Sequence, residues 1–143
     1  MVTLRPVEPP DLPVFYEQQR DPVAVALAGV GGRDRETFDE HWERILANEE
    51  GAIRTVVLGG EVAGHVLSFE HGGRREVGYW IGRGHWGRGV ATAALVAFLG
   101  EDRTRPLYAG VEPANGGSLR VLEKCGFAVC GEDDDGLVLL RLD

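Results

Sequence analysis

The sequence is poor in cysteine and has no long hydrophobic run. Only Cys125 and Cys130 occur among 143 residues, and no histidine is spaced to join them in a zinc site. No segment approaches the roughly 18 apolar residues of a membrane span. The N-terminus also lacks the apolar stretch and the small-residue cleavage site of a secretory signal. We therefore expect a reduced, cytoplasmic protein with neither a metal nor a membrane partner.

Basic residues are also in deficit, since the net charge is −8. This charge argues against nucleic acid as the main partner. Arginines outnumber acids only between residues 74 and 105, so an acidic first half precedes a locally basic middle. Such a distribution is typical of solvated surfaces. It also fits a cationic partner on one side of the molecule and a phosphorylated one on the other.

The remaining composition is that of one ordinary globular domain over residues 1–143, with 43% hydrophobic and 27% charged residues. Glycine is the exception, because its 21 residues are about twice the usual ~7% share. The glycines do not repeat every third residue, which excludes collagen. They concentrate in turns and in one run, Gly82–Gly89.

Hydrophobic periodicity and turn residues predict an α/β or α+β domain, with helices on the faces of a mixed sheet. Asp11 is expected to cap the first helix and Asn115 the last, and residues 21–33 are expected to form a loop. The predicted strands cover residues 2–6, 52–58, 61–70, 74–81, 107–111, 127–130 and 136–142. The predicted helices cover residues 11–20, 34–48 and 90–99, and a further one begins after Asn115.

The glycine run contains the spacing GxGxxG at Gly82, Gly84 and Gly87, between a predicted strand and a predicted helix. This is the spacing of dinucleotide-binding domains. Here, however, the run follows strands joined by hairpins, and Asp102 precedes the next strand instead of ending it. No Gly-Lys-Ser/Thr of a nucleotide-binding P-loop follows either. A dinucleotide-binding domain is therefore disfavoured.

The run still has the properties of an anion site. Glycines allow a ligand to approach the backbone closely, and the first amides of a helix attract negative charge. Arg88, with Arg83 as a second candidate, would add charge-assisted hydrogen bonds. We expect a phosphate or pyrophosphate here; the alternative is a glycine-rich connection without a ligand.

Two segments at a fixed separation carry a family resemblance: EVGYWIGRGHWGRGVATAAL from residue 76 and VEPANGGSLRVLEKCGF from residue 111. Together they resemble the GNAT superfamily of acyl-CoA-dependent N-acetyltransferases, over about residues 52–130. The closest similarity is to the branch that contains the ribosomal-protein N-terminal alanine acetyltransferases. The resemblance implies a mixed, mostly antiparallel sheet whose two central parallel strands, 74–81 and 107–111, splay apart around acetyl-CoA.

The resemblance also implies which residues bind the co-substrate. Backbone groups of Tyr79, Trp80 and Ile81 would bind the pantetheine arm and polarise the thioester carbonyl. Asn115 would contact the cofactor, and Lys124 would pair with a phosphate. The backbone of the next turn would hold the pyrophosphate: Gly87, Arg88, Gly89, Val90, Ala91 and Thr92.

Acetyl transfer to an amine needs a base and an acid. Glu76, on the central strand, is the candidate base; its alternative role is a salt bridge to Arg74 or Arg75, and Glu70 and Glu112 are reserve candidates. Many family members have a tyrosine acid where this chain has Leu122. Ser118 matches the alternative of the closest branch, although it is also an ordinary first-turn residue after Asn115. Water is the alternative acid, and Tyr108 is a third candidate.

The acceptor is expected to be an amine, on a protein N-terminus or on a small molecule. His41 and the acidic residues Asp39, Glu40 and Glu43 of the second helix would suit a cationic acceptor. The alternative to an enzyme is a non-catalytic acyl-CoA-binding or sensor domain. An exposed sheet edge near the C-terminus would permit a homodimer.

Overall fold

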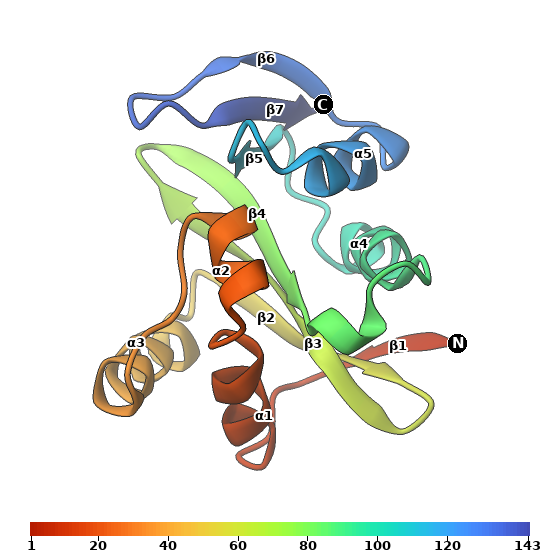
Figure 1. Ribbon diagram of the computed structural model, residues 1–143. Helices are drawn as coiled ribbons and strands as arrows, with labels where there is room; N and C mark the ends of the chain where they lie inside the picture. The colour runs from red at the N-terminus through yellow and green to blue at the C-terminus, as the bar shows by residue number, and fades with distance from the viewer.

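Seven strands form one mixed sheet in the computed structural model, which describes residues 1–143 (Figure 1). The order is β1-β2-β3-β4-β5-β7-β6, and only the β4–β5 pair is parallel. This confirms the predicted fold class. The bounds are β1 (Val2–Arg5), β2 (Ala52–Leu58), β3 (Glu61–His71), β4 (Arg74–Ile81), β5 (Leu107–Val111), β6 (Ala128–Glu132) and β7 (Val138–Leu142).

The parallel pair separates soon after it begins. Glu76 and Tyr108 form the only registered pair between β4 and β5, although β4 continues for five more residues to Ile81. The last residues of β4 therefore leave one side of the strand without a sheet neighbour. The predicted splay of the two central strands is confirmed.

Helices cover both faces of the sheet (Figure 1). The first three helices lie on one face, and α4 and α5 lie on the other, with α4 packed against β1, β2, β3 and β4. The helices are α1 (Asp11–Gln18), α2 (Pro22–Ala28), α3 (Arg35–Ala47), α4 (Val90–Glu101) and α5 (Gly116–Lys124), with a short 3₁₀ turn at Arg83–His85.

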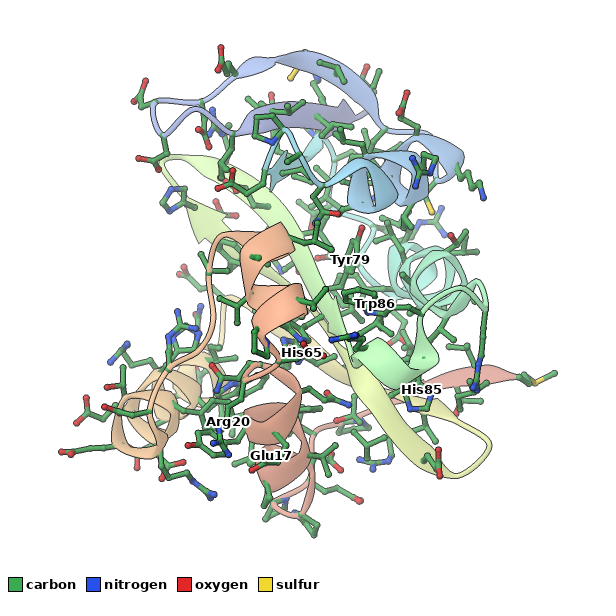
Figure 2. All side chains as sticks on the ribbon, viewed as in Figure 1. Glu17, Arg20, His65, Tyr79, His85 and Trp86 are labelled. Atoms are coloured by element: carbon green, nitrogen blue, oxygen red, sulfur yellow. The ribbon has the colours of Figure 1, made fainter.

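Each face has its own hydrophobic core. The larger core packs α4 and α5 on the sheet and includes the fully buried Leu95, Leu107 and Leu140. The smaller core contains Phe15, Phe38 and Trp42. His65 of β3 packs edge-on against Phe15 and Trp42, with ring centroids 4.9 and 4.8 Å apart (Figure 2). Burying one such large side chain stabilises the fold by about 1.5–3 kcal/mol.

One helix was not predicted, because residues 21–33 were expected to form a loop. Residues Pro22–Ala28 form α2 instead, and Gly29 ends it in the left-handed conformation. The Asp21 carboxylate accepts a hydrogen bond from the Val23 amide at 2.9 Å, with Pro22 in the first helical position. Seven residues are too few to show hydrophobic periodicity, but the Asp-Pro start and the Gly end are helix signals.

Two predicted helix ends are also wrong. Asp11 lies inside α1, and its carboxylate accepts hydrogen bonds from Arg5, the Glu8 amide and Thr55 instead of capping the helix. Gly100 does not end α4, which continues to Glu101. Tertiary contacts determine both helix ends. Arg5 and Thr55, which bind the Asp11 carboxylate, lie on neighbouring strands. Asp102 ends α4 through the contacts described next.

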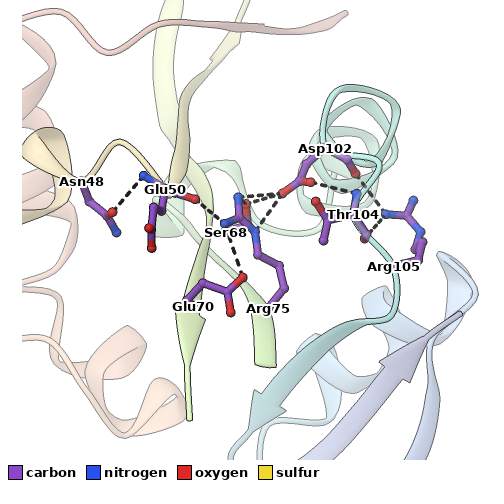
Figure 3. A network of polar contacts seen from close by, with 8 residues as sticks. All are labelled: Asn48, Glu50, Ser68, Glu70, Arg75, Asp102, Thr104 and Arg105. Atoms are coloured by element: carbon purple, nitrogen blue, oxygen red, sulfur yellow. Dashed lines mark hydrogen bonds and ion pairs between the residues drawn. The ribbon is translucent and has the colours of Figure 1, made fainter. Parts of the chain in front are cut away.

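A buried polar network fixes the end of α4 to β3 and β4 (Figure 3). Asp102 is 9% exposed and accepts hydrogen bonds from Ser68 and, at 3.1 Å, from the Thr104 amide. Arg75 lies 3.3 Å from the same carboxylate and donates to Ser68 at 2.9 Å. Burial raises the pKa of Asp102, but the hydrogen bonds and the Arg75 charge outweigh it, so the pKa lies below its ordinary value.

We predict that Asp102→Asn lowers the free energy of unfolding by about 3 kcal/mol at neutral pH, since the buried Arg75 then loses the nearer and more buried of its two carboxylate partners. The matched control is Glu101→Gln, which breaks the exposed 2.9 Å pair with Arg54 and should cost less than about 1 kcal/mol. Urea denaturation measures both values. Equal losses in the two variants would contradict this assignment.

The same measurement has a defined pH dependence. A carboxylate whose pKa is lowered in the folded state stabilises the protein above its unfolded pKa of about 3.9. This stabilisation disappears as the pH falls through the folded pKa. The difference between wild type and Asp102→Asn should therefore be constant at neutral pH and shrink below about pH 4.

Candidate functional site

Two cavities meet at the end of β4. Tyr79 and Trp80 line both of them, and no other residue does. We call the first the loop cavity, of about 760 Å³, between the end of β4 and the beginnings of α4 and α5. We call the second the aromatic cavity, of about 470 Å³, between β3, β4 and the helices α1 and α3. The divergence of β4 from β5 leaves the space in which the first cavity forms.

The loop cavity gathers the residues that the sequence predicted for the co-substrate. Its lining includes Ser118 and all of those residues except Arg88, which lies outside. The predicted residues in the lining are Tyr79, Trp80, Ile81, Gly87, Gly89, Val90, Ala91, Thr92, Asn115 and Lys124.

The start of α4 presents free amides to this cavity. Its first internal hydrogen bond runs from the Ala93 amide to Gly89, so the amides of residues 90–92 have no backbone acceptor. Gly87 and Gly89 have φ of +77° and +71°, and a Cβ at either would meet nothing within 4 Å. Glycine is therefore needed here for the backbone conformation, and the space above the amides is open.

Two cations complete an anion-binding surface. Arg120 and Lys124 of α5 line the same cavity as the free amides. Asn115 holds the start of α5 in place, because its side chain accepts from the Ser118 amide at 3.2 Å. Amides at a helix start together with two cationic side chains fit a ligand that carries several phosphates.

The hydroxyls of Tyr79 and Ser118 are 2.7 Å apart within this cavity. Tyr79 lies on the side of β4 that faces α4 and α5 (Figure 2). Burial raises the pKa of Tyr79 above its ordinary value, while the hydrogen bond with Ser118 acts in the opposite direction. Tyr79 therefore stays protonated at neutral pH. From the sequence, only the backbone of Tyr79 was expected to bind the co-substrate, and its hydroxyl contact with Ser118 was not predicted.

The aromatic cavity has an aromatic lining with one neutral imidazole. Phe15, Trp42 and Trp80 line it beside His65. Burial lowers the pKa of His65 to about 3, with a smaller contribution from His41, so the ring is neutral at physiological pH. Its Nδ1 is buried without a hydrogen-bond partner in the protein.

The charged residues around this cavity differ from the prediction. Asp39, Glu40 and Glu43 do not line it, and Asp39 pairs instead with Arg35 at 3.1 Å. The lining contains Arg33, His41, Arg44 and a single acid, Glu70. Of the residues predicted for the acceptor side, His41 therefore lines this cavity and the three carboxylates do not.

Glu76 lies outside both cavities. It alternates along β4 with Trp80, and its carboxylate is 3.6 Å from Arg74. The salt bridge to Arg74, which was the alternative role of Glu76, is therefore present. Of the two reserve candidates, Glu70 lines the aromatic cavity, and Glu112 lies beside Gly29 at the end of α2.

The chain has no metal-binding cluster and no membrane-spanning helix. No three histidine, cysteine or acidic side chains are grouped to hold a metal ion. None of the helices combines the length and the apolar character needed to cross a bilayer.

The fold agrees with comparisons to known proteins. The family model "Acetyltransferase (GNAT) domain" matches residues 1–128, and the chain therefore belongs to this family. Two curated relatives match shorter segments. An uncharacterized N-acetyltransferase p20 of Bacillus licheniformis is 36% identical over 62 residues, covering 41% of this chain and 35% of that protein. A probable N-acetyltransferase YjcK of Bacillus subtilis is 40% identical over 55 residues, covering 36% of this chain and 30% of that protein.

Solved structures share the whole fold. The aminoglycoside acetyltransferase AAC(6')-Ib, in complex with coenzyme A, has a TM-score of 0.83 at 24% identity, covering 99% of this chain and 94% of that one. The spermidine N-acetyltransferase of Vibrio cholerae, with CoA and spermine, has a TM-score of 0.81 at 17% identity, covering 98% and 92%. Mycobacterium smegmatis RimJ, with CoA-disulfide, has a TM-score of 0.80 at 24% identity, covering 99% and 81%.

We predict that Gly89→Asp weakens coenzyme A binding at least about tenfold while the protein stays folded. The new carboxylate would accept from the free amides of α4 and repel phosphate. Gly59→Asp is the matched control, because Gly59 also has a positive φ (+58°) with open space around it, in the β2–β3 turn. Isothermal titration with coenzyme A measures both. Unchanged affinity in Gly89→Asp would show that the phosphates bind elsewhere.

Proposed function

We propose that the protein is an acetyl-CoA-dependent N-acetyltransferase that transfers an acetyl group directly to a primary amine. The observation that carries this proposal is the meeting of the two cavities at Tyr79 and Trp80. One cavity fits a ligand with several phosphates, and the other is a separate aromatic compartment for the acceptor. Membership of the acetyltransferase family supports the same assignment.

The loop cavity would hold acetyl-CoA. The amides of residues 87–92, that of Arg88 included, would bind the pyrophosphate. Lys124 and Arg120 would pair with phosphates, and Asn115 would line the path of the pantetheine arm. Free backbone groups of Tyr79–Ile81, which have no strand partner on the β5 side, would align that arm and stabilise negative charge on the carbonyl oxygen. Acetyl-CoA supplies a thioester, which is activated toward attack by an amine.

Tyr79 and Ser118 would provide the proton for the departing sulfur. Ser118, predicted as the acid, lines the loop cavity, and its hydroxyl is 2.7 Å from that of Tyr79. Ser118 would donate its proton to the thiolate and accept one from Tyr79, and solvent water would return a proton to Tyr79 before the next turnover. Leu122, at the family's tyrosine position, is only 1% exposed and packs in the large core, so it has no part in this step.

Glu76 remains the proposed base. It lies on the face of β4 that carries Trp80, and it would accept the amine proton through water. The 3.6 Å contact with Arg74 is the ion pair that this carboxylate forms. Arg74 itself lies over the Tyr108 ring, 5.4 Å from its centroid, which limits the movement of the pair.

The acceptor, the branch of the family and the oligomeric state are also proposals. The acceptor would be a protein N-terminus, as in the alanine acetyltransferase branch, or a small amine. The edge strand β6, whose five residues are all exposed, would permit a homodimer. The cytoplasmic location and the single-domain organisation stay predictions. Coenzyme A binding without turnover on any amine would favour the acyl-CoA sensor instead.

We predict that Ser118→Ala lowers kcat roughly 10²-fold and that Tyr79→Phe lowers it about tenfold, with KM for acetyl-CoA little changed. Because the two hydroxyls act in one relay, the double variant should be no slower than Ser118→Ala alone. Tyr108→Phe, on the neighbouring strand, is the control and should keep wild-type kcat. Thiol release from acetyl-CoA measures the rates. Independent, multiplicative losses would contradict the relay.

We predict that Glu76→Gln lowers kcat roughly 10²-fold and leaves KM for acetyl-CoA unchanged. Arg74→Gln separates this role from a structural one, because it breaks the same ion pair and keeps the carboxylate. A structural role would make the two variants alike, with a lower Tm and a normal kcat. A similar kcat in both would therefore remove Glu76 as the base.

A further inference from the structure

Positive charge without a counter-charge surrounds the aromatic cavity. Arg33 and Arg44 line it, and neither belongs to any of the ten ion pairs of the structure. Arg35, two residues from Arg33, pairs with Asp39 instead and does not line the cavity. The only acid in the lining, Glu70, lies 3.9 Å from Arg75, so its charge is already partly balanced.

The two guanidinium groups act on the same part of the cavity. His41, which also lines it, has its pKa lowered by burial and then by the charges of Arg33 and Arg44. Both arginines are therefore close enough to His41 to disfavour a further positive charge. An incoming cation would meet the same repulsion, and an anion would be attracted.

The backbone of Arg33 is held in place by a buried side chain. Gln19 is 6% exposed; its amide oxygen accepts from the Arg33 amide at 2.8 Å, and its nitrogen donates to the Arg33 carbonyl at 3.1 Å. The Gly32 amide donates to the Gln19 carbonyl at 2.8 Å. This backbone is therefore ordered before any acceptor binds, which lowers the entropic cost of binding.

The rest of the lining fits an apolar body with one polar group. Phe15, Trp42 and Trp80 offer aromatic surface, and the neutral His65 has a buried Nδ1 without a partner. An acceptor that fills this space would gain from apolar contact and from one hydrogen bond to the imidazole.

We propose that the aromatic cavity binds an anionic group of the amine acceptor between Arg33 and Arg44. The preferred acceptors would then be amines that also carry a carboxylate or another anion at the end away from the amine. This inference rests on the proposed function, since it names the substrate class of that same site. Polycationic acceptors, such as the spermine bound to the Vibrio cholerae spermidine N-acetyltransferase, would be disfavoured.

The test uses two acceptors that differ by one charge, para-aminomethylbenzoate and para-aminomethylbenzamide. Each has a primary amine at one end of an aromatic ring. Trp42 and Trp80 line the cavity, so tryptophan fluorescence of the coenzyme A-saturated protein reports acceptor binding. The benzoate should bind about tenfold more tightly than the amide, as expected for one charge-assisted contact, and kcat/KM should follow the same order.

Variants assign the preference to the cavity. Arg33→Gln/Arg44→Gln should reduce the difference between the two compounds to about twofold or less, chiefly through KM for the benzoate. Arg35→Gln removes one charge from the same region outside the cavity and should keep the tenfold difference. Arg44→Gln alone, at an exposed position, gives an intermediate loss if the double variant folds poorly.

The outcomes separate this inference from the proposed function. Equal affinity of the two compounds for wild type, tighter binding of spermine, or loss of the preference in Arg35→Gln would each overturn the anion site. Transfer to neither compound, nor to any other amine, would overturn the enzyme assignment, while the fluorescence titration would still decide whether the cavity selects an anion.

Discussion

The separation of β4 from β5 is the constraint on which the rest of the structure depends. The two strands share one registered pair and then diverge, so the backbone of β4 loses a neighbour inside a sheet that is otherwise paired throughout. Unpaired buried backbone groups are costly, and a fold keeps them only where another partner satisfies them. In this protein the partner would be the arm of acetyl-CoA, which would complete the sheet as a strand does.

Two packed cores make this arrangement stable without the missing strand contacts. The larger core includes Ile81 and Val90, which flank the glycine run, and the Asp102 network fixes the far end of α4 to β3 and β4. The smaller core of Phe15, Phe38 and Trp42 positions α1 and α3 on the opposite face. The loop cavity therefore borders the larger core and the aromatic cavity borders the smaller one. Strand β4 lines both cavities.

Much of the fold could be predicted from the sequence, because strands, hairpins and the long amphipathic helices have local sequence signals. The start of α4 after the glycine run was predicted correctly, and Gly87 and Gly89 of that run have positive φ. The α2 helix was missed because it is too short for periodicity. The Tyr79–Ser118 contact was missed because residues 39 apart in the chain have no local signal that they touch.

The error over the acceptor side has a more general physical origin. Counting acids on a helix gives the charge of the segment, but the field inside a cavity depends on which side chains face it. Asp39 is paired with Arg35, whereas Arg33 and Arg44 are unpaired and line the cavity. A protein of net charge −8 thus directs cations at both of its cavities, Arg120 and Lys124 at one, Arg33 and Arg44 at the other. Since exposed charges are screened over about 8–10 Å at physiological salt, these local cations govern what enters each cavity. The overall charge governs solubility and long-range encounter, so the proposed acceptor class rests on the residues that face the cavity and not on the net charge.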